Sequence, residues 1–306
     1  MKLMISGSSG LVGSQLCQRL NSDSAFEIVR LVRNSASDGL GPSVIWQPSE
    51  DRLSADLFSG IDAVIHLGGT NIANKRWSPE VKKTIYNSRV QSTRLLANTL
   101  ASLDNPPATF LCASAIGYYG DRGSVRVDEN SPRGLGFLAN VCEAWEQATQ
   151  PAVKAGIRVV NMRFGMILDK SAGALSKMLT PFKLGAGGKI GSGSQYWSWI
   201  ALPDVINAIL FCLQNEGVQG PVNFVAPDEV TNLKFTKTLG KVLSRPTCLP
   251  VPAFGIKTLF GEMGQELMLS SARVTPERLR SAGFEFQYAK LEDALRSILS
   301  NESHSR

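Results

Sequence analysis

The chain opens with a glycine turn between an apolar strand and a helix. Residues 1–5 form a short apolar run, and residues 14–20 carry apolar side chains at helical spacing. Gly7, Gly10 and Gly13 lie between them. A dinucleotide pyrophosphate needs a tight turn, a closely approachable backbone and a helix N-terminus. A side chain at Gly7 or Gly10 would block that approach, and one at Gly13 would push the helix off the strand. This pattern predicts a dinucleotide site, with an ordinary glycine turn as the alternative.

The second predicted strand, residues 26–32, ends at Arg33, 20 residues after Gly13. Folds that bind NAD usually place an acidic residue there to take the ribose hydroxyls. A guanidinium can instead hold a 2′-phosphate through two hydrogen bonds, and no carboxylate stands here to repel it. The sequence therefore predicts a preference for NADP, with a surface arginine at the end of a strand as the alternative.

A third buried strand ends in a pair of glycines. Residues 62–69 are apolar up to Gly68 and Gly69, where a cofactor can lie across the carboxyl end of a parallel strand. We interpret His66 within this run as a core histidine rather than a catalyst. The long helix predicted over residues 79–103 carries Arg89, which can reach a phosphate or can equally be a solvated surface arginine.

Strands and helices alternate along the first half of the chain. Strands at residues 109–114 and 157–164 flank a helix at residues 137–147, as expected of a doubly wound parallel sheet. The predicted fold class is α/β, a Rossmann-type parallel sheet with a smaller C-terminal substrate lobe. The expected division is an NADP-binding domain at 1–168 to which 201–225 returns, and a substrate lobe at 169–200 and 226–306.

Composition narrows the class of protein. A chain of 306 residues with 43% hydrophobic and 19% charged residues is expected to be globular. The net charge of +6 is not concentrated in any run, which suits an anionic small ligand and argues against nucleic acid. Five scattered cysteines and two histidines argue against a metal site and a Ser-His-Asp triad.

Two further patterns bear on the cellular location of the protein and on phosphate binding. The sequence contains no signal peptide and no run of about 18 apolar residues, so we expect a cytoplasmic protein with no membrane partner. The glycine-rich stretch at residues 185–193 lacks both the strand-to-helix setting and the Gly-Lys-Ser/Thr ending of a phosphate loop. We therefore do not interpret it as a Walker motif.

These features together resemble the extended short-chain dehydrogenases/reductases. More narrowly, the chain is similar to an atypical branch described as NADP-dependent nucleoside-diphosphate-sugar epimerases, whose bacterial members also carry a cell-division-inhibitor label. The resemblance covers nearly the whole chain. The motifs that carry the narrower match are residues 114–120, Trp145-Glu146, 181–185, 191–193, Trp199-Ile200 with Asp204, and 276–284.

The resemblance implies a cofactor site more firmly than a reaction. Active members carry a Tyr-x-x-x-Lys pair on the helix after the serine strand, where the tyrosine moves a proton and the lysine lowers its pKa. In this sequence the corresponding places are Leu138 and Cys142, and no Tyr-x-x-x-Lys occurs anywhere. The nearest mimic, Tyr118 with Arg122, falls in a loop.

The catalytic candidates are Ser114, Tyr118 and Tyr119. Ser114 would bond a substrate oxygen and a tyrosine would act as acid or base, although packing of Tyr119 over the sheet is an equal alternative. The expected activity is that of an NADP-binding oxidoreductase or epimerase-like enzyme on a small molecule, for example a sugar nucleotide. A non-catalytic NADP(H)-bound sensor or scaffold is the alternative, and it is favoured by the missing Tyr and Lys.

NADP is the predicted cofactor. The expected assembly is a monomer, or a homodimer formed through helix 79–103, with no nucleic-acid partner. The residues predicted to contact the cofactor are Gly7, Ser9, Gly10, Leu11, Val12, Gly13, Arg33, Leu67, Gly68, Gly69, Arg89, Ala113, Arg163 and Ile167.

Overall fold

The computed structural model of the chain describes residues 1–34, 39–48 and 53–300, so that His304 lies outside the described residues. The chain divides into two compact units. Unit 1 comprises residues 1–114, 141–163 and 206–222, and unit 2 comprises residues 115–140, 164–205 and 223–306.

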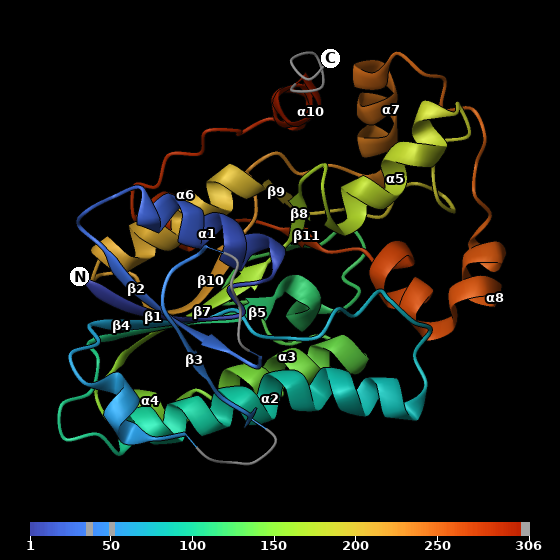
Figure 1. Cartoon of the computed structure of the whole chain (residues 1–306). Coiled ribbons are helices and arrows are strands. Elements are labelled where there is room, and N and C mark those ends of the chain that lie inside the picture. The colour runs from blue at the N-terminus through green and yellow to red at the C-terminus, as the bar shows by residue number, and fades with distance from the viewer. Residues whose placement is uncertain (35–38, 49–52, 301–306) are drawn as a thin grey trace. The chain divides into compact units, whose positions relative to one another are not determined.

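Unit 1 is built on a parallel sheet, as the alternation of strands predicts (Figure 1). The seven strands lie in the order β10-β7-β5-β4-β1-β2-β3, which places β1 between β4 and β2, with parallel pairing on both sides. The central strands are buried on both faces, which explains their continuous apolar runs. The strands are β1 (Lys2–Ser6), β2 (Glu27–Val32), β3 (Ser43–Ile45), β4 (Ala63–His66), β5 (Thr109–Ala115), β7 (Arg158–Phe164) and β10 (Gly220–Phe224).

Helices cover both faces of this sheet. Figure 1 shows α1 (Leu11–Asn21) and α6 (Leu202–Gln214) on one face, with α2 (Pro79–Ala101) and α4 (Gln150–Lys154) on the other. Helix α2 begins at Pro79, and its N-cap Ser78 accepts a hydrogen bond from the Val81 N–H. The doubly wound Rossmann-type fold that the sequence predicts is confirmed. Within the described part of the chain, every helix is too short or too polar to cross a membrane.

Unit 2 contains two short parallel pairs of strands. Strand β8 (Met166–Leu168) pairs with β9 (Trp199–Ala201), and β6 (Arg126–Val127) pairs with β11 (Arg273–Val274). Its helices are α5 (Gly173–Lys183), α7 (Asn232–Leu243), α8 (Ala253–Gly264), α9 (Glu277–Ser281) and α10 (Leu291–Ser300), with a π-helical turn at Gln265–Leu269. Helix α3 (Phe137–Gln147) begins in unit 2 and ends in unit 1.

A separate apolar core holds unit 2 together. It includes Leu175 and Leu179 from α5, Phe235 and Leu239 from α7, and the fully buried Trp199. The Trp199 indole donates to the Asp228 carbonyl, so its only N–H is satisfied inside this core.

One buried carboxylate fastens a long C-terminal segment of unit 2 to this core. The carboxylate of Asp204 accepts the backbone N–H groups of Gln287 and Tyr288, at 2.7 and 3.0 Å. Burial raises the pKa of Asp204, and these two hydrogen bonds oppose that change. Asp204 therefore secures a segment that has little regular structure of its own.

Candidate functional site

The glycine turn presents a bare helix N-terminus. Gly7 has a φ of +75°, and its carbonyl accepts the Gly10 N–H at 3.0 Å, which closes the turn. Helix α1 then starts at Leu11 with Gly10 as its N-cap and no side-chain hydrogen bond to the first amides. The first N–H groups of α1 are therefore available to an anionic ligand.

The three glycines do not all serve the same purpose. A Cβ at Gly13 would lie 2.2 Å from the Gly7 carbonyl oxygen, so Gly13 lets α1 pack against the turn as predicted. A Cβ at Gly7 would lie 2.6 Å from the carbonyl carbon of Leu67, so a glycine is needed here for the turn to pack against the backbone that follows β4. At Gly10 the nearest atom is 3.4 Å away, which leaves open the space that a ligand would use.

A buried hydroxyl without a partner lies in the same turn. The Ser8 side chain is only 1% exposed, and its Oγ makes no hydrogen bond within the described residues. Buried hydroxyls are nearly always hydrogen-bonded in native proteins, because an unpaired one costs free energy. The turn thus offers both a bare helix end and an unused polar group, an arrangement that fits a bound pyrophosphate.

His66 at the end of β4 is a structural residue. Its Nδ1 is hydrogen-bonded to Ser6 Oγ and its Nε2 lies 3.2 Å from Ser92 Oγ. Complete burial lowers its pKa to about 3, so the ring is neutral at physiological pH. The interpretation of His66 as a satisfied core histidine is confirmed, and its ring packs beneath Gly68, where a Cβ would lie 3.0 Å from Cε1.

Arg89 lies against the glycine pair that follows β4. Its guanidinium donates to the Thr70 and Ile85 carbonyls, and its Cζ lies 5.2 Å from the centre of the Trp145 ring. A Cβ at Gly69 would fall 3.2 Å from the same Cζ. Burial lowers the pKa of Arg89. The hydrogen bonds described for this guanidinium go to carbonyl and hydroxyl oxygens, so its charge remains available to an anion.

Arg33 ends β2 with its side chain exposed. Unlike Arg89, it is exposed, and it follows the last strand residue, Val32. This placement leaves the guanidinium accessible at the carboxyl end of the sheet, where open α/β sheets bind their ligands.

Ser114 belongs to a buried charged network within unit 1. Its hydroxyl donates to Glu146 Oε1 at 2.7 Å, and Arg163 holds the same carboxylate through two hydrogen bonds of 2.7 and 2.8 Å. The side chain of Arg163 is 3% exposed and that of Glu146 is 13% exposed. The sequence analysis assigned Arg163 to the cofactor and did not identify this ion pair, although a charged residue inside a buried strand indicates that a partner must exist.

The two tyrosines of the catalytic prediction lie in unit 2. Tyr119 is fully buried and its hydroxyl donates to Asn223 Oδ1 at 2.8 Å. Its ring packs edge-on against Tyr118, with 5.5 Å between ring centres, and Tyr118 is only half-buried. Arg122 donates to the carbonyls of Tyr119 and Pro132, so it organises the loop backbone.

A carboxylate meets the first turn of α3 in unit 2. The two oxygens of Glu266 accept the N–H groups of Phe137 and Leu138 at 2.7 and 2.9 Å. Gly136 precedes them at a φ of +114°, and a Cβ there would lie 3.0 Å from Glu266 Oε1. Glu266 was missed by the sequence analysis because 128 residues separate it from Leu138.

The remaining predicted residues are divided between the two units. Ser9 and Leu11 flank the N-cap of α1, Ala113 is buried in β5, and Ile167 is half-buried in β8 of unit 2. Unit 2 also contains a polar cavity of about 520 Å³. Its lining comprises Arg126, Val127, Asp128, Ser131, Pro227, Glu229, Thr275, Pro276, Glu277 and Arg280.

Two family models match the chain. The NAD dependent epimerase/dehydratase family matches residues 3–225, and a domain of unknown function, DUF1731, matches residues 251–298. Epimerase family protein ML0860 of Mycobacterium leprae (strain TN) is 38% identical over 95% of this chain and 93% of its own length. Epimerase family protein SDR39U1 of Homo sapiens is 32% identical over 98% of this chain and 100% of its own length.

Two solved structures are similar in both fold and sequence. The crystal structure of human epimerase family protein SDR39U1 (isoform2) with NADPH has a TM-score of 0.88 and 29% identity, over 98% of this chain and 100% of that chain. The nucleoside-diphosphate sugar epimerase from Corynebacterium glutamicum has a TM-score of 0.80 and 32% identity, over 98% of this chain and 58% of that chain. On the family match and the near full-length relatives, this chain belongs to the NAD dependent epimerase/dehydratase family.

Proposed function

We propose that this chain binds NADP(H) through unit 1 and uses it as an oxidoreductase or epimerase-like enzyme on a small hydroxyl- or carbonyl-bearing molecule. One observation carries the cofactor assignment: a bare helix N-terminus lies beside the buried, unpartnered Ser8 hydroxyl. A human relative whose structure is similar along the whole chain was crystallised with NADPH.

The cofactor would use three separate parts of unit 1. The backbone from Ser9 to Gly13 at the start of α1 would hold the pyrophosphate, because its amides lack internal partners. Arg33 would hold the 2′-phosphate at the end of β2, through charge-assisted hydrogen bonds. Arg89 would supply the positive charge beside Leu67, Gly68 and Gly69.

Chemistry would depend on a small number of side chains. When bound, the nicotinamide supplies the hydride acceptor or donor. Ser114, whose O–H is donated to Glu146, presents oxygen lone pairs to a substrate hydroxyl. Tyr118 would exchange the proton, and Tyr119, held by Asn223, would orient the Tyr118 ring through their edge-on contact. A sugar nucleotide is the proposed substrate class, by analogy with the Corynebacterium glutamicum relative.

Nucleotide affinity tests the cofactor assignment. We would titrate NADPH and NADH into the purified protein and into Arg33→Ala at fixed salt. The wild type is expected to bind NADPH at least tenfold more tightly than NADH, and Arg33→Ala to lose that difference. Arg19→Ala, an exposed arginine of α1, is the matched control and should keep the preference. Absence of binding of either nucleotide would contradict the proposal.

A second function is favoured by the missing acid–base pair. Leu138 and Cys142 carry no group able to move a proton as the family tyrosine and lysine do, which suits a non-catalytic NADP(H) sensor or scaffold. Turnover of a panel of hydroxy and keto compounds separates the two functions. An enzyme should lose turnover in Ser114→Ala and Tyr118→Phe but keep it in Tyr86→Phe, an exposed control on α2. A sensor should bind NADPH with no turnover in any variant.

A further inference from the structure

The positive charge of the chain is concentrated in two stretches of unit 2. Residues 170–203 and 230–261 contain nine lysines and arginines and no aspartate or glutamate. The whole chain has 32 basic and 26 acidic residues, so the chain outside these two stretches has 23 basic and 26 acidic residues. We call these two stretches the basic lobe. The sequence analysis saw no charged run because the cations are spaced several residues apart.

The fold brings the two stretches together. Val251 donates its N–H to the Lys189 carbonyl and accepts the Gly191 N–H, both at 2.8 Å. Six residues earlier, the Arg245 Nε donates to the Lys183 carbonyl at 2.8 Å. Residues 183–191 therefore run alongside residues 245–253, and the helices α5 and α7 that precede these segments pack together (Figure 1). We call these paired segments the ribbon.

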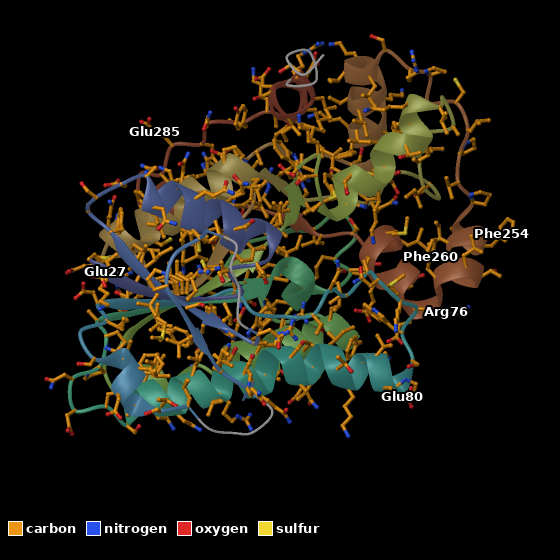
Figure 2. The ribbon with its side chains drawn as sticks, viewed as in Figure 1. Glu27, Arg76, Glu80, Phe254, Phe260 and Glu285 are labelled. Carbon is orange, nitrogen blue, oxygen red and sulfur yellow. The ribbon has the colours of Figure 1, made fainter. Side chains whose placement is uncertain are left out.

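Large apolar side chains project from the ribbon and from the helix that follows it. Leu184 is 79% exposed, Leu249 58%, Phe254 75% and Leu259 69%. Phe254, Lys257 and Leu259 are all exposed on α8, and Figure 2 shows Phe254 at the outer edge of that helix. Isolated exposed apolar side chains are ordinary, but three leucines and a phenylalanine on the ribbon and the helix that follows it indicate a surface that a partner covers.

Several cations around these apolar side chains are not neutralised by carboxylates. Lys189 donates to the Ser192 carbonyl and Arg245 to two backbone carbonyls, which orients these groups without balancing their charge. By contrast, Lys234 and Lys241 on α7 form ion pairs with Asp228 and Glu292. Within the described residues, positive charge without a carboxylate partner therefore lies on the ribbon, and α8 carries Lys257 together with one acidic residue, Glu262.

We propose that the ribbon and α8 dock on the surface of an anionic lipid bilayer. Projecting apolar side chains can enter the interfacial layer one by one, while the surrounding lysines and arginines attract anionic headgroups. Nucleic acid would use the charge but not the leucines. The expectation of no membrane partner rested on the lack of a segment long and apolar enough to span a bilayer. Docking on the surface of a bilayer does not require such a segment.

Vesicle sedimentation of the full chain tests this surface. The protein is expected to bind vesicles of phosphatidylcholine with 30% phosphatidylglycerol at least tenfold more tightly than vesicles of phosphatidylcholine alone. High salt should weaken this binding, because headgroup attraction is screened. A folded protein that binds neither kind of vesicle at low salt overturns the proposal, and binding to an acidic protein would then explain the surface.

Matched variants locate the contact. Phe254→Ser and Lys257→Glu change exposed side chains and are expected to weaken vesicle binding at least fivefold each. Leu135→Ser and Lys83→Glu make the same changes at exposed positions outside the basic lobe and should leave binding unaltered. Equal losses in the test and control variants would overturn the assignment to this surface. Circular dichroism of each variant establishes that it is folded.

Discussion

Each unit of the molecule contains a glycine-rich loop, and the two loops use their glycines differently. In unit 1, the space beside Gly10 is open and the neighbouring Ser8 hydroxyl is unpartnered within the described chain. In unit 2, a Cβ at Gly187 would lie 2.6 Å from the Phe182 ring, and one at Gly188 would lie 1.7 Å from the Leu249 carbonyl oxygen. In the second loop, the space beside these glycines is therefore already occupied by other atoms of the protein.

This difference separates a ligand-binding loop from a packing loop. Glycine content is similar in both, but what matters is whether protein atoms occupy the volume that a side chain would take. The glycines of residues 185–193 lie against other parts of the protein, among them Phe182 and Leu249, whereas the turn before α1 keeps an unfilled space at a helix N-terminus. Substitutions at matched glycines can therefore test whether the two loops differ in this way.

The largest losses of stability are expected at the glycines of these two loops whose added Cβ would meet backbone atoms most closely, Gly13 and Gly188. Gly13→Ala would place a methyl group 2.2 Å from the Gly7 carbonyl oxygen, a contact that only movement of α1 can relieve. We expect a loss of stability on the order of 5 kcal/mol, or failure to fold. Gly10→Ala should fold normally, because Gly10 has a φ of −80° and open space, yet bind NADPH at least tenfold more weakly. Chemical denaturation and NADPH titration measure the two effects.

Gly188→Ala is the matched control from the second loop. It should destabilise the protein, because its methyl group would meet the Leu249 carbonyl, but leave the NADPH affinity of the folded protein unchanged. If Gly10→Ala keeps full NADPH affinity, the space beside Gly10 is not the pyrophosphate site. If Gly188→Ala instead abolishes affinity, the two loops do not differ as described.

Glu146 is expected to have the next largest effect. Glu146→Ala leaves the buried Arg163 guanidinium without its carboxylate, and breaking a buried pair from one side costs about 3–5 kcal/mol. Denaturant unfolding of the variant measures this loss. A double variant, Glu146→Ala with Arg163→Met, removes both charges and should recover much of the stability. A single variant as stable as wild type would show that the ion pair does not hold β7 and α3 together.

Local patterns made most of unit 1 predictable. The predicted helix over residues 14–20 corresponds to α1, and the predicted strand over residues 62–69 to β4, which ends at His66, although Leu67 still donates its N–H to the Ser6 carbonyl of β1. Apolar periodicity and glycine spacing act over a few residues, so a single sequence displays them.

Contacts between distant segments were not predictable. Glu146 binds Arg163, 17 residues away in the sequence, and Glu266 binds the Leu138 N–H, 128 residues away, so no local pattern predicts either pair. The basic lobe was missed because its cations are spaced several residues apart, and because no local pattern predicts that residues 183–191 lie beside residues 245–253. The roles of Ser114, Tyr118 and the cofactor contacts remain predictions that the experiments above address.

The pH dependence of stability contrasts buried groups in the two units. Burial lowers the pKa of His66 from 6.5 to about 3, so its stabilising contribution is complete above pH 6.5 and is lost as pH falls below that value. Between pH 7.5 and 5.5 this amounts to about 1 kcal/mol. Burial raises the pKa of Glu129 in unit 2, so the pH dependence has the opposite sign. The contribution of Glu129 to stability is present at low pH and is lost as pH rises.

His66→Gln isolates the histidine contribution. The free energy of unfolding of the wild type should fall relative to that of the variant as pH decreases from 7.5 to 5.5, while their difference stays constant above pH 7.5. Urea denaturation at a series of pH values measures both. If the difference does not change with pH, the unfolded and folded pKa values of His66 are alike, and the ring is not buried in its neutral form.

The smallest effect is expected at the exposed ion pairs of unit 2. Arg126 donates to both oxygens of Glu229, but its side chain is 61% exposed, and Arg273 holds the same carboxylate at 2.6 Å. Solvent screening and the remaining arginine should make the stability of Arg126→Ala indistinguishable from wild type in urea denaturation. The geometry resembles that of Glu146 and Arg163 in unit 1, so the exposure of Arg126 and the second arginine on Glu229 would account for the difference. A large loss in Arg126→Ala would show instead that the bidentate contact, rather than burial, determines how much an ion pair contributes in this protein.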